Sequence, residues 1–357
     1  MRMDKFRIDS HKLVYHIPRV YQWLQGKNIY PIYIDVGLFG GCNHRCIFCA
    51  FDYIKYKPNI LDERCLKKFV AVAARNGVKS IMYAGEGEPL LHKDISSIVH
   101  FTKEKGIDVA VISNAVMFSK ELAAKMLPYL SWFRASIDAG TPKTYSLIHK
   151  SNQQEFNIVL SNLKEAVRIK NRNKYNCNIG VQFLLIPQNY WEAPILANKL
   201  KDIGLDYLIV KPYSQHPKSK NRTDFNLKYN DLFYLEKKLQ KYSKGGFQVV
   251  FRKNAMYKLE EEKKHYKRCL GLPFATFVSA SGDVYPCNMF LGSRNFVFGN
   301  IRNESFRKIW EGKRRKEIMN IINSRWAIQK CRKACRLDEI NCYLWELKNP
   351  PHHVNFI

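Results

Sequence analysis

The sequence contains no apolar run close to the ~20 residues that a membrane-spanning helix needs. Ten cysteines in 357 residues are too few for a fold held together by disulfides. The first ten residues mix charged and apolar side chains, which argues against a secretory signal. Internal repeats and low-complexity tracts are missing as well. With 46% hydrophobic and 25% charged residues, which excludes general disorder, the sequence predicts a globular protein of the cytoplasm.

Acidic residues are also scarce. Asp and Glu together number 31 against 59 Lys and Arg, which leaves a net charge of +28. Such an excess is typical of proteins that bind nucleic acid. The basic residues, however, are spread along the chain instead of being gathered in one arm. An RNA-binding or RNA-modifying protein is therefore an alternative that is not favoured, and RNA affinity that falls steeply with salt would reveal it.

Residues 31–215 alternate between strand-like and helix-like segments. Strands are expected over residues 32–36, 78–84, 109–113, 132–137, 179–186 and 205–211. Helices are expected over residues 61–76, 92–105, 120–127, 155–170 and 191–203. This order predicts an α/β fold with a parallel sheet and right-handed crossovers, two units short of a complete eight-stranded barrel. Chemistry in such folds lies at the carboxyl ends of the strands, so the loops after each strand are the places to search.

The changes of composition along the chain predict five parts. They are an N-terminal extension (1–30), the barrel core (31–215), a helical, highly charged connector (216–265), a small cysteine-containing domain (266–345) and a tail (346–357). In the small domain, short strands are expected at residues 276–279 and 284–285 and a helix at residues 306–310.

The strongest signal is a group of three cysteines, Cys42, Cys46 and Cys49, in the loop after the first strand. A disulfide is disfavoured in a reducing compartment. Zinc would need a fourth ligand, and His44 lies at an awkward spacing for that role. Three thiolates on a compact loop suit a [4Fe–4S] cluster with one iron left open. An open iron indicates a reactive site and not a structural one.

With the aromatic Phe48 just before the third cysteine, this loop resembles that of the radical S-adenosylmethionine (SAM) superfamily. The resemblance implies a partial (β/α)6 TIM-like barrel whose open iron binds the amino and carboxylate groups of SAM. A reductant such as flavodoxin or ferredoxin would supply one electron to the cluster. The C5′–S bond of SAM then breaks, and the 5′-deoxyadenosyl radical removes hydrogen from a substrate. The protein contributes positioning and exclusion of water.

Further motifs at the strand ends match this family. The segment 84–90 resembles its Gly-Gly-Glu-Pro motif, which holds the SAM amino group, although Glu86 replaces the first glycine. The resemblance places SAM contacts at Phe48, Gly85, Gly87, Glu88, Pro89, Ser113, Asn114, Ser136, Asp138 and Gln182. The alternative is that these residues form turns and helix caps, roles that Ser, Asn and Asp favour.

The sixth strand runs into a polar segment that is expected to face the substrate. Lys211 can pair with a phosphate or carboxylate. Tyr213 or His216 can donate a proton or hydrogen atom, or bind the substrate. The alternative is a plain polar loop that leads into the connector.

A second group of cysteines lies near the C-terminus. Cys269 is followed by a turn at Gly282 and by Cys287, and then by Cys331, Cys335 and Cys342. This order resembles the SPASM and twitch auxiliary-cluster domains of the same superfamily. The resemblance implies one closed [4Fe–4S] cluster on Cys269, Cys287, Cys331 and Cys335. The gap between the last two is one residue longer than usual, so Cys342 is an alternative ligand, and zinc is an alternative metal.

Together these features predict a radical SAM enzyme, an oxidoreductase or a lyase or isomerase, with an auxiliary iron–sulfur domain. The 30 residues before the barrel are too few for a peptide-binding winged helix, which favours a small polar substrate, sugar- or nucleotide-linked. The alternative is a peptide or protein maturase of the SPASM type.

Overall fold

The computed structural model describes residues 6–221, 227–261 and 263–356. Within these residues, the strands form one sheet in the order β10-β9-β8-β1-β2-β3-β4-β5-β6-β7. The strands are β1 (Tyr33–Val36), β2 (Ser80–Tyr83), β3 (Asp108–Ser113), β4 (Trp132–Ser136), β5 (Asn178–Leu185), β6 (Tyr207–Pro212), β7 (Gln248–Phe251), β8 (Ala275–Val278), β9 (Asp283–Tyr285) and β10 (Gly299–Asn300). Neighbouring strands from β8 through β1 to β7 pair in parallel, and the sheet curves into a barrel that stays open between β7 and β8.

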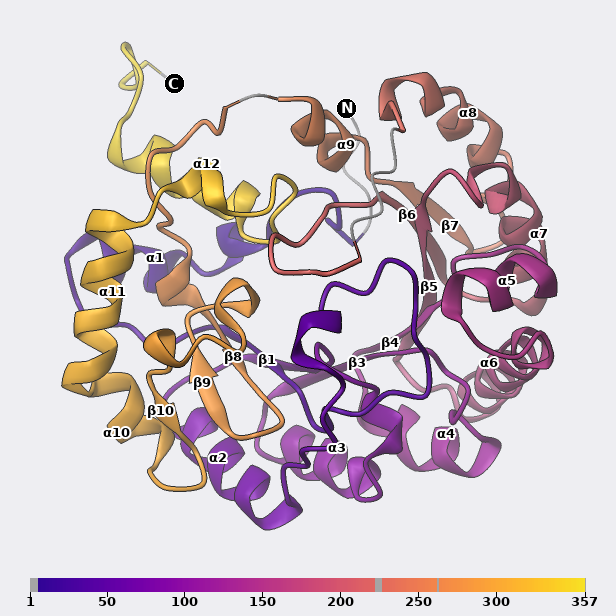
Figure 1. Ribbon diagram of the computed structural model, residues 1–357, viewed down its shortest axis with the longest axis horizontal. Helices are drawn as coiled ribbons and strands as arrows, with labels where there is room; N and C mark the ends of the chain where they lie inside the picture. Colours follow the sequence, from indigo (N-terminus) through magenta and orange to yellow (C-terminus); the bar gives the residue numbers. More distant parts are fainter. Residues whose placement is uncertain (1–5, 222–226, 262, 357) are drawn as a thin grey trace.

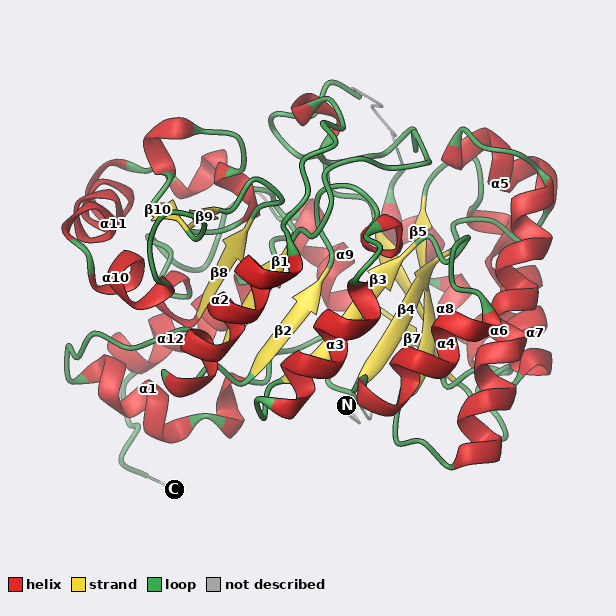
Figure 2. Ribbon diagram, turned by 90° about the horizontal axis from the view of Figure 1, so that it is seen from below, coloured by secondary structure: helices red, strands yellow, loops and turns green. Residues whose placement is uncertain are grey.

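Helices surround the convex side of this sheet, as Figures 1 and 2 show. They are α1 (Ile17–Leu24), α2 (Glu63–Arg75), α3 (Ile95–Glu104), α4 (Lys120–Met126), α5 (Pro142–His149), α6 (Gln154–Asn173), α7 (Ala193–Ile203), α8 (Tyr234–Gln240), α9 (Lys253–Glu260), α10 (Phe306–Glu311), α11 (Lys313–Arg325) and α12 (Asp338–Lys348). Several begin at side chains suited to the first turn: Asp62 accepts from the Cys65 amide and Ser119 from the Leu122 amide.

The two faces of the sheet differ in chemistry because successive side chains of a strand point to opposite sides. On β1, Ile34 and Val36 are fully buried in the main hydrophobic core. Their neighbours Tyr33 and Asp35 are half-buried and point into the barrel. Polar side chains on the concave face, at the ends of several strands, therefore share one interior.

The six predicted strands and the five predicted helices of residues 31–215 are all present, with ends shifted by a few residues. The sequence did not predict α5, or that β8 pairs in parallel with β1. The expected helical connector needs a correction, because it contains β7, which pairs in parallel with β6. The short β7 segment lies close after Gly245 and Gly246, too short for its periodicity to separate it from a loop.

The residues before β1 pack on the barrel. Leu13 and Val20 join a small core with Phe274 and Leu344 from the C-terminal part of the chain. Residues 1–5 of the predicted extension, 222–226 and 262 of the predicted connector, and 357 of the predicted tail lie outside the described residues. In the described parts of the chain, no helix has both the length and the apolar character needed to cross a membrane.

Candidate active site

The three cysteines of the first loop lie together after β1. Burial, and to a lesser degree the neighbouring thiols, raise the pKa of Cys46, and burial raises the pKa of Cys42 to about 11. Without metal these thiols are therefore neutral at pH 7, and metal binding must release their protons. In the described residues, only His44, Cys46 and His149 bring three ligand atoms within 4.8 Å of one another. At least one pair of the three cysteine sulfurs is therefore farther apart than 4.8 Å, which is wider than the about 3.8 Å between two sulfurs of a single zinc site.

One imidazole contacts this loop from a distant part of the chain. His149, at the end of α5, is 1% exposed, and its Nδ1 lies 3.2 Å from Cys46 Sγ. The Asp138 amide donates to His149 Nε2 at 3.4 Å, so Nε2 is an acceptor and the proton resides on Nδ1. Burial lowers the His149 pKa well below its usual value, which keeps the ring neutral. The Nδ1–H therefore donates to the Cys46 sulfur. Sequence reasoning missed His149 because 103 residues separate the partners.

The segment after β2 presses against the cysteine loop. Gly87 has φ +67°, and a Cβ there would lie 2.0 Å from the Phe39 carbonyl oxygen, so only glycine fits. The Glu88 amide donates to the Gly41 carbonyl oxygen at 2.8 Å. Pro89 follows as the first residue of a 3-10 turn. The predicted motif thus lies beside the predicted cluster loop.

Glu88 connects this segment to the end of β3. Its buried carboxylate accepts from Ser113 Oγ at 2.6 Å and from the Asn114 amide at 2.8 Å. Asn114 Nδ2 in turn donates to Asn43 Oδ1, inside the cysteine loop, at 2.7 Å. The side chains of Glu88, Ser113 and Asn114 therefore brace the loop.

Glu86 stands where the family's motif has its first glycine. Its side chain has a hydrogen-bond partner in the structure. Its carboxylate accepts a hydrogen bond from the Ala280 amide in the turn between β8 and β9. Burial raises the Glu86 pKa to about 7. Gly85 lies against the Phe277 ring of β8. This segment therefore joins the SAM-motif region to the C-terminal hairpin.

Three predicted residues form one hydrogen-bonded row across neighbouring strands. Gln182 Nε2 donates to Ser136 Oγ at 2.7 Å, and Lys211 Nζ donates to Gln182 Oε1 at 2.9 Å. Asp138, just beyond β4, is 2% exposed and accepts from the Leu184 amide at 2.6 Å. Burial raises the pKa of Asp138 to about 7 and lowers that of Lys211 to about 7. These three hydrogen-bonded side chains make this part of the barrel interior polar.

The other substrate-side candidates, Tyr213 and His216, follow Lys211 along the chain. The aromatic rings of Tyr213 and Phe48 pack on one small apolar cluster that includes Leu184. His216 is buried, and its ring stacks on Tyr53 with a centroid distance of 5.2 Å. Burial lowers its pKa to about 4, so it is neutral at pH 7. His216 thus contacts the segment that follows Cys49.

The second cysteine group encloses a cavity. Cys269, Cys287, Cys331 and Cys335 all line it, together with apolar side chains, whereas Cys342 does not. Asn341 Nδ2 lies 3.5 Å from Cys269 Sγ, and Trp326 Nε1 donates to Cys331 Sγ at 3.3 Å. Burial raises the pKa of Cys269 to about 12. Four thiols with N–H donors in an apolar shell fit a closed iron–sulfur cluster, whose thiolates need such donors.

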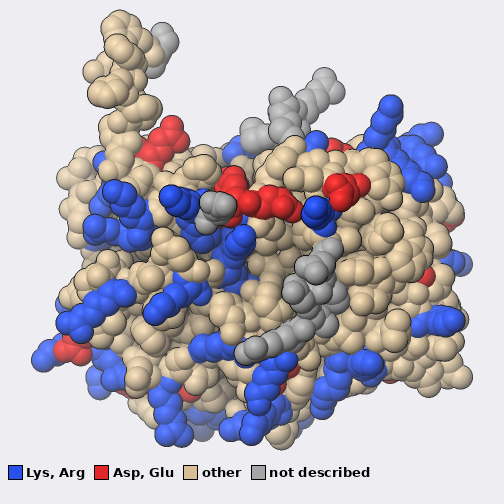
Figure 3. Space-filling model, turned by 45° about the horizontal axis from the view of Figure 1, so that its top comes forward, with Lys and Arg blue, Asp and Glu red and all other residues tan. Residues whose placement is uncertain are grey.

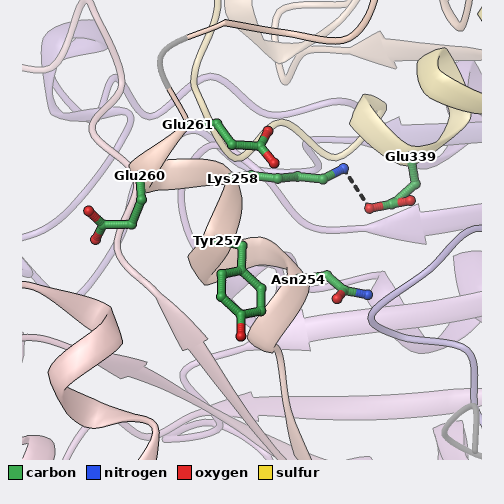
Figure 4. A pocket seen from close by; sticks show the side chains of 6 residues that line it. All are labelled: Asn254, Tyr257, Lys258, Glu260, Glu261 and Glu339. Atoms are coloured by element: carbon green, nitrogen blue, oxygen red, sulfur yellow. Dashed lines mark ion pairs between the residues drawn. The ribbon is translucent and has the colours of Figure 1, made fainter. Parts of the chain in front are cut away.

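A separate surface pocket of about 590 Å³ lies between α9 and α12 (Figure 4). Glu260, Glu261 and Glu339 line it, and Lys258 Nζ lies 2.5 Å from Glu339 Oε1. None of the residues predicted from the sequence is among its lining residues. The surrounding Lys and Arg side chains are scattered over this face and form no single stripe (Figure 3).

Comparison with known families agrees with this geometry. Residues 36–206 match the radical SAM superfamily, and residues 269–336 match the SPASM iron–sulfur cluster-binding domain. The chain belongs to the radical SAM superfamily and carries a C-terminal SPASM domain. It is therefore an enzyme that uses SAM, a [4Fe–4S] cluster and an auxiliary cluster, and it needs a reductant.

Several relatives align over most of the chain. A tungsten-containing aldehyde ferredoxin oxidoreductase cofactor-modifying protein of Pyrococcus furiosus is 20% identical over 79% of this chain and 81% of its own length. The antilisterial bacteriocin subtilosin biosynthesis protein AlbA of Bacillus subtilis is 22% identical over 90% of this chain and 69% of its own. The structure of Streptococcus suis SuiB bound to precursor peptide SuiA is similar, with a TM-score of 0.67 at 16% identity over 94% of this chain and 77% of that one.

Proposed function

We propose that this enzyme modifies a peptide or protein substrate by removing a hydrogen atom from it. The observation that carries the proposal is the similarity to AlbA, which extends over 90% of the chain. SuiB, which shares the fold, is bound to a precursor peptide. These relatives support a peptide substrate better than the small polar substrate expected from the sequence.

Each part of the site has a role in this proposal. Cys42, Cys46 and Cys49 would hold the cluster with SAM at its open iron, and this bound group would supply the radical chemistry that removes hydrogen from the substrate. Gly85, Gly87 and the hydrogen-bonded pair of Ser136 and Gln182 orient SAM. The apolar cluster around Phe48 and Leu184 keeps water from the reacting groups.

The second site has a different part. Cys269, Cys287, Cys331 and Cys335 fill the coordination of an auxiliary cluster, so this site exchanges electrons with the substrate or shapes its pocket. Flavodoxin or ferredoxin is the proposed electron donor to the first site.

Deuterium transfer tests the class of substrate. Extract from cells of the source organism grown in D₂O is incubated with the reconstituted enzyme, unlabelled SAM and a strong reductant, and 5′-deoxyadenosine is analysed by mass spectrometry. We expect deuterium to enter 5′-deoxyadenosine and the transfer to disappear after protease treatment of the extract. The variant in which Cys42, Cys46 and Cys49 are all changed to Ala serves as the blank.

Two other results would contradict the proposal. Transfer that resists protease and passes an ultrafilter would indicate the small polar substrate. Transfer lost only after ribonuclease treatment would favour the RNA-modifying alternative, for which the net charge of +28 is the motivation.

A further inference from the structure

Two histidines lie against the middle cysteine of the first loop. His149 Nδ1 is 3.2 Å from Cys46 Sγ. His44, Cys46 and His149 each offer one ligand atom, and these three atoms all lie within 4.8 Å of one another. A tetrahedral divalent ion holds such nitrogen and sulfur ligands about 3.3–3.6 Å apart. Shifts of about 1 Å are therefore enough to close the three ligands around one ion.

The backbone holds His149 beside the loop. The Arg45 amide donates to the His149 carbonyl oxygen at 3.1 Å, and the Ile47 amide donates to the Ile148 carbonyl oxygen at 2.9 Å. The helix α5, which ends at His149, packs against α6, which carries Glu155 (Figure 1). The imidazole and the nearby carboxylate thus come from elements that are fixed to each other and to the loop without any metal.

His44 has a buried nitrogen that no described residue uses. Its Nε2 lies 2.7 Å from Glu155 Oε2, and because a carboxylate can only accept, Nε2 carries the proton. Nδ1 of the neutral ring is left with a lone pair, and this atom is buried without a hydrogen-bond partner among the described residues. The residue is 1% exposed. A buried acceptor without a donor is unfavourable, and a metal ion would satisfy it.

Each of the two imidazoles has a carboxylate on the side away from Cys46. Glu155 accepts from His44 Nε2, and Asp138 Oδ2 lies 3.6 Å from His149 Nε2. In metal sites, the ring nitrogen that does not bind the metal usually donates to a carboxylate or a carbonyl oxygen, which orients the ring and makes it a better ligand. The two histidines therefore have the supporting groups of metal ligands.

We infer that His44, Cys46 and His149 bind a single divalent transition-metal ion, Fe²⁺ or Zn²⁺, before the cluster is assembled on the first loop. Two imidazoles and one thiolate suit these ions. Binding releases the Cys46 thiol proton to solvent, and the His149 proton moves from Nδ1 to Nε2, where the Asp138 carboxylate accepts it. The ion and the cluster exclude each other, because both need the Cys46 thiolate. The substrate takes no part, so failure of the proposed function leaves this inference unaffected.

Anaerobic titration of the full-length, cluster-free chain with Co²⁺ tests the site. The thiolate-to-cobalt absorption grows with the number of sulfur ligands, so it distinguishes the two kinds of site. We expect about two ions per chain, one bound by the four cysteines of the second site and one bound by a single thiolate. The difference spectrum between the unchanged chain and His149→Phe isolates the single-thiolate ion. Displacement of this cobalt by Zn²⁺ and by Fe²⁺ then ranks the two ions.

Substitutions separate this ion from the cluster. His44→Phe or His149→Phe should lose the single-thiolate ion and still reach about eight irons per chain after reconstitution, because the three cysteines remain. Cys42→Ala combined with Cys49→Ala should do the opposite. This variant should keep the ion on Cys46 and hold only about four irons.

Two further variants serve as comparisons. Glu155→Ala removes the carboxylate behind His44, so it should weaken the ion by about tenfold to a hundredfold and leave the iron content unchanged. His100→Phe, at a half-exposed position on α3, is the matched control and should keep both the ion and the iron. Circular dichroism on the same samples identifies any variant that has lost its fold.

Three outcomes would overturn the inference. The single-thiolate ion is lost in the variant without Cys42 and Cys49, which would assign it to the three cysteines together; or it persists in folded His44→Phe and His149→Phe; or the unchanged chain binds only the ion with four thiolates. Each of these results is obtained without SAM, reductant or substrate.

Discussion

The two cysteine sites of this enzyme are built in opposite ways. The first is a single loop of eight residues, Cys42 to Cys49, braced from outside by Glu88 and Asn114. The second closes only when residues separated by more than 60 positions meet around one apolar cavity. A local loop with three thiols leaves a coordination position for SAM, whereas four thiols from distant segments leave none. Under the proposed ligand assignment, the number of ligands thus divides reactive chemistry from electron transfer.

Removing the first site should have the largest effect. With Cys42, Cys46 and Cys49 all changed to Ala, we expect iron to fall from about eight to about four per chain and formation of 5′-deoxyadenosine to cease. Iron analysis and chromatography of the SAM products measure both. Cys65→Ala, on α2, is the control and should keep both. SAM cleavage in the triple variant would refute the assignment of the open iron to this loop.

Removing the second site should separate the cleavage of SAM from the reaction on the substrate. Cys269→Ala combined with Cys287→Ala should keep about four irons and still cleave SAM with a strong reductant. An oxidative reaction on the substrate should stop, because the substrate radical has lost its electron acceptor, while a redox-neutral reaction should partly survive. Circular dichroism must accompany the assay, since the loss of a metal cluster can unfold the domain that binds it.

Cys342 provides the matched control for that comparison. It does not line the cavity of the other four cysteines, so Cys342→Ala should keep about eight irons. A loss of four irons in this variant would show that Cys342 is a ligand. Stoichiometric zinc in the unchanged enzyme would contradict the two-cluster assignment.

A smaller effect is expected at His149. Its Nδ1–H donates to the Cys46 sulfur, and hydrogen bonds to cluster sulfurs raise the reduction potential. His149→Phe should therefore make the first cluster harder to reduce, which a potentiometric titration followed by electron paramagnetic resonance measures. His100→Phe, at a half-exposed position on α3, is the control. An unchanged potential in a variant with full iron content would show that this hydrogen bond does not tune the cluster.

The smallest effect concerns the hydrogen bond between Glu86 and the Ala280 amide, which joins the segment after β2 to the C-terminal hairpin. Burial raises the Glu86 pKa from 4.5 to about 7, so the folded protein binds a proton that the unfolded chain has released. Its stabilising contribution is complete below pH 4.5 and is lost as the pH rises through about 7. Glu86→Gln, which can still accept from the Ala280 amide, should gain stability relative to the unchanged protein between pH 5.5 and 8.5. Over this pH range the gain grows by on the order of 2 kcal/mol. A difference in melting temperature that stays constant over this range would be inconsistent with a buried, titrating Glu86.

Local patterns in the sequence were enough to predict the radical SAM family and most of the barrel. Cysteine spacing within a loop, alternation of strands and helices, and glycines at a strand end depend on neighbours along the chain, so they can be read without coordinates. The same reasoning predicted the β8–β9 hairpin and its turn at Gly282. It failed at β7, where four residues carry too little periodicity.

Only the tertiary structure decided what depends on distant partners. It placed β8 beside β1, although more than 230 residues separate them. It brought His149 to Cys46, Glu86 to Ala280, and Arg332 to the Ser214 carbonyl oxygen. It also gathered four of the five C-terminal cysteines around one cavity and left Cys342 outside. Each contact is fixed by the packing of the whole sheet and its helices, which no local stretch of sequence encodes. The sequence thus determined which chemistry the chain carries, and the fold determined which residues surround that chemistry.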